Sequence, residues 1–168
     1  MSAGDSSLVR VSARELADVR HRAETAARGR AKILLHGNDT KNVQHMLECY
    51  RLDSYMAPHR QLNRKKSYQI VEGELSVLFF NNEGNLEELV EMGDHRSGKA
   101  FLLHFPADRW HTVLPRSNLV IYVEVIPGPY RAENTHFAPW APPNEDVAGG
   151  LKFLAGLFAP ETGLHRSR

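Results

Sequence analysis

A succession of short apolar segments, separated by turn-forming residues, constrains the fold of this chain more than any other feature. About eight such segments lie at residues 31–36, 43–51, 68–71, 75–80, 86–90, 100–105, 111–114 and 119–126. Clusters of Gly, Asn, Asp, Pro and Ser, such as residues 81–85 and 115–118, separate most of them. Short strands that alternate with turns, and not with helices, are typical of antiparallel proteins. We therefore expect an all-β fold of the jelly-roll kind, a barrel or double-sheet sandwich.

A helix is predicted on each side of this region. Ser12 and Glu15 have the spacing of a capping box, which predicts a helix over residues 13–28 that stops at Gly29. Asn144 is expected to cap a last helix, and the tail from residue 160 is expected to be mobile. The predicted organisation is one domain in four parts: a flexible leader (1–10), an N-terminal helix (11–30), the barrel (31–130), and a proline-rich strip with helix and tail (131–168).

The amino-acid composition limits the cellular compartment and the classes of partner that we expect for this protein. The 168 residues are 42% hydrophobic, which is enough for one sizeable core, and 21 basic against 20 acidic residues give a net charge of +1. This balance gives no reason to expect nucleic acid or a membrane surface as partner. Cys49 is the single cysteine, and no signal peptide or membrane span is recognisable. We expect a cytoplasmic protein with a small-molecule ligand, and a homodimer because jelly rolls expose sheet edges.

His59 and His111 are the candidate functional histidines. Each adjoins a predicted strand and has proline nearby, so two distant pieces of chain are expected to build one pocket. Together with Lys66, and with Arg60 and Arg109 close in sequence, they would give the pocket positive character. Such a pocket suits a carboxylate, a phosphate or a sugar nucleotide.

Two neighbouring features carry alternative interpretations. The basic run at residues 64–66 is typical of a solvated turn, since it lacks interleaved aromatic residues. Trp110 could stack on the apolar face of a sugar, or it could anchor the proline-rich strip to the barrel.

The same residues resemble the two motifs of the cupin superfamily. The first motif maps onto His59, Gln61, Lys66 and Gly73, and the second maps onto Pro106, Asp108 and His111. More narrowly, the chain resembles the WbuC family of cupin-fold metalloproteins over roughly residues 28–145. The matching strings lie at residues 42–47, 54–60, 109–112, 124–130 and 137–142.

This resemblance implies a double-stranded β-helix barrel. It also implies a role near lipopolysaccharide, O-antigen or sugar-nucleotide metabolism, because members are encoded among surface-polysaccharide genes.

The departures from the cupin pattern affect the metal site. Where a metal-binding cupin has three histidines and one glutamate, this chain has His59, Gln61, Lys66 and His111. Glutamine is a neutral and weaker ligand, and lysine places a cation where a divalent ion needs an anion. The resemblance therefore implies a degenerate site, in which one divalent ion would be held by His59, Gln61 and His111.

Three functional classes follow, and whether the protein is an enzyme stays open. The first is a cupin with a degenerate metal site that acts on a sugar or sugar nucleotide. The second is a metal-free isomerase or epimerase, in which His59 or His111 is the base and Tyr55, Tyr68 or Tyr122 is the acid, with Lys66 as a further candidate. The third is a non-catalytic cupin that binds a small ligand. Its tentative binding residues are Arg60, Lys66, Tyr68, Arg109 and Trp110.

Overall fold

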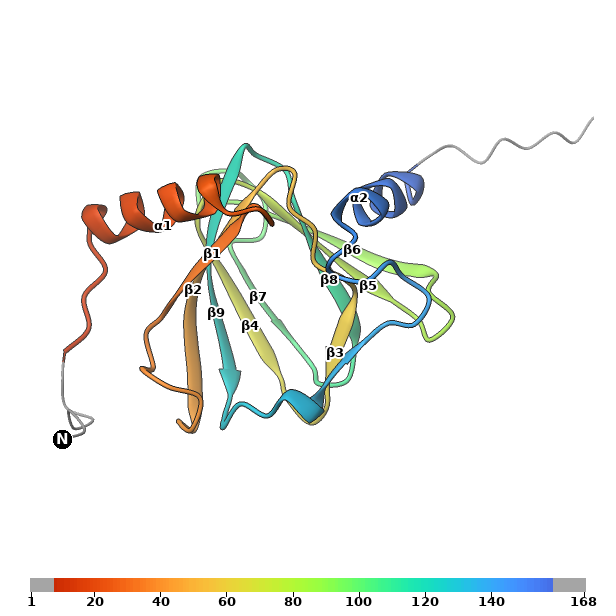
Figure 1. Cartoon of the computed structure of the whole chain (residues 1–168), viewed down its shortest axis with the longest axis horizontal. Helices are drawn as coiled ribbons and strands as arrows, with labels where there is room; N and C mark the ends of the chain where they lie inside the picture. Colours follow the sequence, from red (N-terminus) through yellow and green to blue (C-terminus); the bar gives the residue numbers. More distant parts are fainter. Residues whose placement is uncertain (1–7, 159–168) are drawn as a thin grey trace, which may run out of the picture.

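Two antiparallel five-stranded sheets, one against the other, form the body of the protein (Figure 1). The computed structural model describes residues 8–158 of the chain. The first sheet has the order β1 (Arg30–Leu34), β2 (Val43–Arg51), β9 (Leu119–Pro127), β4 (Lys66–Glu72) and β7 (Leu102–Phe105). The second has the order β10 (Thr135–Phe137), β3 (His59–Gln61), β8 (Trp110–Pro115), β5 (Leu75–Phe80) and β6 (Leu86–Met92). This is a jelly-roll barrel, so the predicted fold class is confirmed.

The core between the sheets is apolar and strongly aromatic. The ring of Phe105, in the first sheet, makes edge-on contacts with aromatic rings of both sheets. Its centroid lies 5.3 Å from that of Tyr68, which is in the same sheet, and 5.2 Å from that of Phe79, which is in the second sheet. Along β4, Lys66, Tyr68 and Ile70 face inward while Gln69 is exposed. The alternation of a strand therefore brings one charged residue onto the same inner face as the aromatic core.

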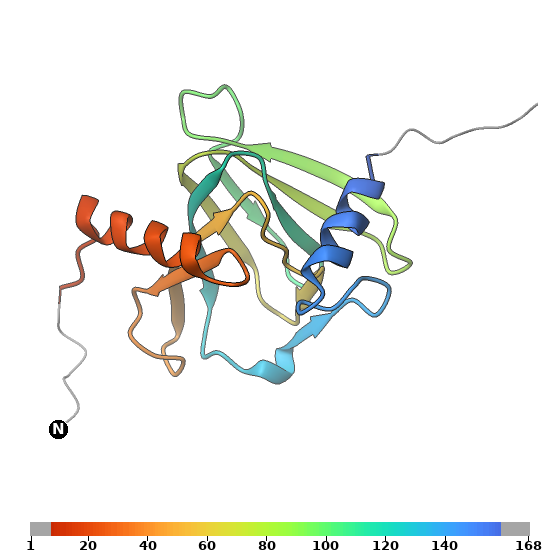
Figure 2. The same cartoon turned by 45° about the horizontal axis from the view of Figure 1, so that its top comes forward.

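A helix covers the outer face of each sheet. Helix α1 (Ala13–Thr25) packs Val19 and Ala23 against Leu47, Cys49 and Ile121, which point outward from the first sheet. Helix α2 (Val147–Gly156) packs Leu154 in a cluster with Leu78 and Phe80 of β5. The two helices lie on opposite sides of the barrel (Figure 2).

The capping prediction holds for the first helix and fails for the second. Ser12 and Glu15 form the expected capping box, although α1 ends at Thr25, before residue 28. The N-cap of α2 is Asp146, whose side chain accepts from the Gly149 N–H. Asn144 is not the cap, because its Oδ1 accepts a hydrogen bond from the Ala57 N–H at 2.9 Å and so ties the C-terminal segment to the chain before β3.

Three short elements were not predicted. Strand β3 and strand β10 have three residues each, and a 3-10 helix, η1 (Ala132–Asn134), precedes β10. Segments of this length carry too few residues for a periodicity to be recognised. The predicted mobile tail from residue 160 lies outside the described residues, as does most of the predicted leader.

The expectation of a solvated basic turn at residues 64–66 was wrong for two of its three residues. Lys65 is exposed, but Arg64 and Lys66 are buried. The Arg64 guanidinium donates to the carbonyl oxygen of Pro129, and Lys66 points into the barrel. Successive residues of this basic run therefore alternate between buried and exposed positions, as residues at the start of a strand do.

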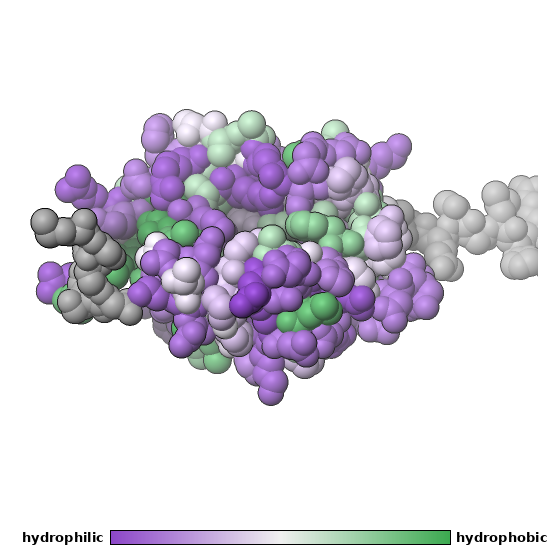
Figure 3. Space-filling view, turned by 60° about the horizontal axis from the view of Figure 1, so that its bottom comes forward, coloured by the Kyte–Doolittle hydropathy of each residue, from purple (hydrophilic) through white to green (hydrophobic). Residues whose placement is uncertain are grey.

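The face shown in Figure 3 is mostly hydrophilic, with small separate apolar patches. Within residues 8–158, no helix combines the length and apolar character needed to cross a membrane. The homodimer and the four-part boundaries stay predictions.

Candidate functional site

The two candidate histidines lie side by side. His59 of β3 and His111 of β8 are register partners, and their ring centroids are 4.5 Å apart. The Nδ1 of His59 lies 3.1 Å from the Ala57 carbonyl oxygen, and the Nδ1 of His111 lies 2.8 Å from that of Arg109. Because a carbonyl only accepts, each Nδ1 carries the proton and each Nε2 keeps a lone pair.

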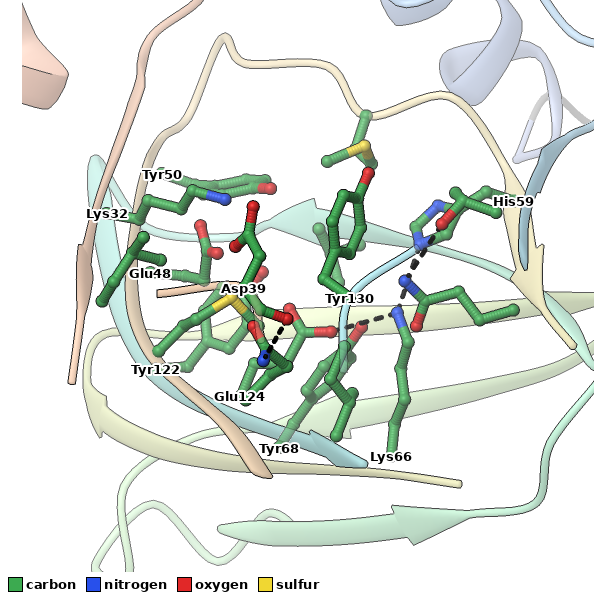
Figure 4. A pocket seen from close by; sticks show the side chains of 18 of the residues that line it. Lys32, Asp39, Glu48, Tyr50, His59, Lys66, Tyr68, Tyr122, Glu124 and Tyr130 are labelled. Atoms are coloured by element: carbon green, nitrogen blue, oxygen red, sulfur yellow. Dashed lines mark hydrogen bonds and ion pairs between the residues drawn. The ribbon is translucent and has the colours of Figure 1, made fainter. Parts of the chain in front are cut away.

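Lys66 occupies the space beside this pair. Its ammonium lies 3.2 Å from the Nε2 of His59 and 3.0 Å from Oε1 of Glu124 on β9 (Figure 4). The Lys66 side chain is only 2% exposed and that of Glu124 is 12% exposed. A buried ammonium requires partners of this kind, and here one neutral acceptor and one carboxylate supply them.

Both histidines are neutral at physiological pH. Burial, and next the charge of Lys66, lower the pKa of His59 to about 3. The same two causes, in that order, lower the pKa of His111 well below its ordinary value. The lone pair of His59 is therefore available to accept the hydrogen bond from Lys66.

These residues do not fit a divalent metal ion. The available donors are three neutral atoms, namely Nε2 of His59, Nε2 of His111 and Oε1 of Gln61. The last two are buried without a hydrogen-bond partner among the described residues. However, the Lys66 ammonium already takes the His59 lone pair, and a dication would be placed beside it with strong repulsion. Among residues 8–158, no group of three or more His, Cys, Asp and Glu side chains is arranged to hold a metal.

A cavity of about 300 Å³ opens between the sheets next to this site. His59, Gln61, Lys66 and Tyr68, all singled out in the sequence, line it. So do Glu124 and five residues that the sequence interpretation did not select: Lys32, Gln44, Glu48, Tyr50 and Thr135. The walls thus combine aromatic rings with hydroxyl, amide, carboxyl and ammonium groups.

Glu48 is the acidic residue of the cavity whose pKa is shifted most. It is 8% exposed, and within the described part of the chain its carboxyl has no hydrogen bond or ion pair. Burial, followed by the charge of Glu124, raises the pKa of Glu48 to about 7. Glu48 can therefore exchange a proton near neutral pH. By contrast, burial raises the pKa of Tyr68 and Tyr122 well above the ordinary value, so both keep their hydroxyl protons.

Five candidate residues lie outside this cavity lining: Tyr55, Arg60, Trp110, Arg109 and His111. The Tyr55 hydroxyl donates to the Pro142 carbonyl oxygen at 2.8 Å, and burial raises the pKa of Tyr55 to about 12. Arg60 stacks on Trp110, with its guanidinium 4.5 Å from the ring centroid. The Nε1 of Trp110 donates to Asn82 Oδ1 at 3.1 Å.

Arg109, the fourth, lies over the Phe79 ring and forms ion pairs with Glu87 and Glu88. His111 also lies behind the lining, since it packs between His59 and Phe105.

Strand alternation did not single out the two buried acids. Glu48 alternates with Met46 and Tyr50 on β2, but Leu47 and Cys49 on the other face are apolar and buried too. Glu124 likewise lies between two valines on β9, so alternation alone does not say which face points inward. The pairing of Glu124 with Lys66 depends on sheet order, which alternation does not reveal.

Part of the sequence matches a known protein family. Residues 11–92, just under half of the chain, match the family described as "Domain of unknown function (DUF6016)". No curated protein matches the sequence.

Solved structures match by shape at low sequence identity. A crystal structure of a Shewanella oneidensis protein is 12% identical, with 83% of this chain and 92% of that chain covered, at a TM-score of 0.59. Oxalate decarboxylase from Bacillus subtilis is 13% identical, with 64% of this chain covered, at a TM-score of 0.49. Procruciferin from Brassica napus is 15% identical, with 56% of this chain covered, at a TM-score of 0.44.

The chain spans 27% of the decarboxylase and 22% of procruciferin. At such identities these likenesses concern the fold alone, and of these three structures the Shewanella oneidensis protein, with a TM-score of 0.59, shares the fold of this chain.

Proposed function

We propose that this protein is a metal-independent cupin that binds a small hydroxylated ligand in the barrel, with the Lys66 ammonium in place of a metal ion. One observation carries the proposal. The ammonium lies between a histidine Nε2 and a buried carboxylate, at the residue where the cupin resemblance expects a metal-binding glutamate. The Lys66 ammonium thus pairs with Glu124 and takes the His59 lone pair that would otherwise be free for a metal.

The chemistry of the cavity supports a hydroxylated ligand. Gln61 Oε1 is a buried acceptor without a partner among the described residues, so it can accept from a ligand hydroxyl. Protonated tyrosines and Lys66 can donate to ring or hydroxyl oxygens, and the faces of Tyr68 and Phe137 offer apolar walls. The WbuC resemblance, with its link to surface-polysaccharide genes, supports a ligand from the sugars or sugar nucleotides.

Ligand-induced stabilisation tests this proposal. The melting temperature is measured with neutral monosaccharides and with sugar nucleotides, since a ligand that binds only the folded state raises it. We expect a dose-dependent rise for the wild type and a reduced rise for Gln61→Leu. Gln69→Leu is the matched control, because Gln69 points outward from β4 and is exposed. Absence of any rise in the wild type, or equal rises in both variants, would contradict the proposal.

A second candidate function is metal-free isomerisation or epimerisation, and the position of Glu48 favours it. The lone pair of His59 is engaged by Lys66 and its pKa is about 3, so His59 is a weak base in this state. Glu48 lines the same cavity with a pKa of about 7, which suits a general base at neutral pH.

Turnover of keto-sugar nucleotides by Glu48→Gln, His59→Asn and the wild type tests this second function. We expect Glu48→Gln to be the more damaging change. Unchanged turnover in Glu48→Gln would exclude Glu48 as the base.

A further inference from the structure

A second cavity adjoins the first at the start of β1. It has a volume of about 500 Å³ and lies where the turn after α1 enters the sheet. It shares Lys32, Glu48, Tyr50 and Met56 with the barrel cavity, so the two spaces meet along these side chains. Lys32, Glu48 and Tyr50 stand together on one side of the barrel cavity in Figure 4.

Three cations, Arg28, Arg30 and Lys32, and one acid, Glu48, line this second cavity. Arg28, Arg30 and Lys32 form no ion pair within residues 8–158, whereas Arg20, Arg51 and Arg109 do. The Nε of Arg28 is buried and has no hydrogen-bond partner in the described chain. A guanidinium N–H that no protein acceptor occupies is free to donate to a ligand oxygen.

The two arginines are nevertheless held in place. Nη2 of Arg28 donates to the Asn144 carbonyl oxygen at 3.3 Å. Nη1 of Arg30 contacts the Met56 sulfur at 3.2 Å, and its guanidinium lies 5.8 Å from the Tyr50 ring centroid. Neutral contacts therefore position both side chains, and among the described residues Glu48 is the single carboxyl group in the lining opposite three cations. This differs from Arg109, which two glutamates neutralise on the surface.

We infer that Arg28, Arg30 and Lys32 form a subsite for the anionic end, phosphate or carboxylate, of a ligand whose hydroxylated part enters the barrel cavity. The inference rests on the proposed function for the position of the hydroxylated part. Arginine suits such a subsite because its planar N–H donors match the oxygens of phosphate and carboxylate groups. Glu48, at the junction of the two cavities, would lie between the anion and the hydroxylated part.

Calorimetric titration with small anions tests the subsite. Pyrophosphate, inorganic phosphate and malonate serve as probes, so that phosphate and carboxylate chemistry are compared directly. We expect the affinity for the preferred anion to fall about tenfold or more in Arg28→Gln and in Arg30→Gln. Arg131→Gln is the charge-matched control, because Arg131 is 63% exposed and lies outside both cavity linings. Circular dichroism of each variant checks that the fold is retained.

The outcomes separate the subsite from the proposed function. Anion affinity that is equal in Arg28→Gln, Arg30→Gln and Arg131→Gln, or absent in the wild type, would overturn the subsite. Neutral monosaccharides report on the barrel cavity alone, so their stabilising effect should survive Arg28→Gln. If anions bind through Arg28 and Arg30 while neutral sugars and sugar nucleotides give no stabilisation, the subsite stands and the hydroxylated ligand is excluded.

Discussion

Replacement of Lys66 by methionine is the perturbation whose effect follows most directly from the geometry. Methionine keeps much of the side-chain length and removes the charge. Glu124, whose side chain is 12% exposed, then loses its ion-pair partner. Loss of one member of a buried pair costs about 3–5 kcal/mol, because the other charge stays buried without compensation.

The same loss can be worked out through protonation of Glu124. If the unpaired carboxylate takes up a proton in the folded state, this costs 1.36 kcal/mol per pH unit above the ordinary glutamate value of about 4.3. The cost is then about 3.7 kcal/mol at pH 7 and about 1 kcal/mol at pH 5. The folded variant holds a proton that the unfolded chain has lost, so the variant loses stability relative to the wild type as the pH rises.

Urea denaturation of the wild type and Lys66→Met between pH 5 and pH 7.5 measures this difference. We expect the destabilisation to grow with pH, and the double variant Lys66→Met/Glu124→Gln to lose most of that pH dependence. Lys65→Met is the control, since Lys65 is exposed and should change the stability by less than about 0.5 kcal/mol. A destabilisation under about 1 kcal/mol at pH 7, or one that is the same at both ends of the pH range, would refute the buried pair.

Three further predictions concern the metal site, helix α2 and Glu48. The double variant Gln61→His/Lys66→Glu restores the ligand set of the cupin motif, so calorimetry should show stoichiometric binding of a divalent ion; heat signals equal to those of the wild type would exclude this. Gly150→Ala places a Cβ 2.3 Å from the Tyr55 ring and should destabilise the fold by about 1–3 kcal/mol in thermal denaturation, whereas an unchanged melting temperature would contradict this contact. Burial raises the pKa of Glu48 from 4.5 to about 7, so between these two pH values the folded protein keeps a proton that the unfolded chain loses. The free energy of unfolding of the wild type should therefore fall by up to about 3 kcal/mol as the pH rises from 4.5 to 7. Glu48→Gln should abolish this fall in urea denaturation; a profile parallel to that of the wild type would show that another group is responsible.

The fold was largely predictable because the barrel strands carry strong local signals. Alternation and turn residues located eight of the ten strands, and Gly73 shows why the turn chemistry was informative. Its φ of +80° and the Leu119 carbonyl oxygen, 2.4 Å from where a Cβ would lie, leave room for glycine alone. Strands β3 and β10 were missed because their pairing depends on distant partners.

The site was predictable only in part. The resemblance located His59, Gln61, Lys66 and His111, and the structure places the two histidines side by side with Lys66 next to His59. The partner of Lys66 is Glu124, which lies on β9 beside β4 in the sheet and is distant in sequence. Sequence proximity selected Arg60 and Arg109 as anion-binding residues. Arg60 directly follows His59 on β3 and so points to the opposite face. Arg109 precedes β8, lies over the Phe79 ring and pairs with two glutamates. Arg28 and Arg30 reach the cavity from the turn after α1 and the start of β1, which no local pattern indicates.

Elemental analysis of the purified protein, after incubation with manganese, iron, nickel and zinc and removal of loosely bound ions, tests the central claim most directly. If Lys66 takes the place of the metal, the wild type should retain far less than one divalent ion per chain, while Gln61→His/Lys66→Glu should retain close to one. One tightly held ion per wild-type chain, lost on replacement of His59 or His111, would contradict the account.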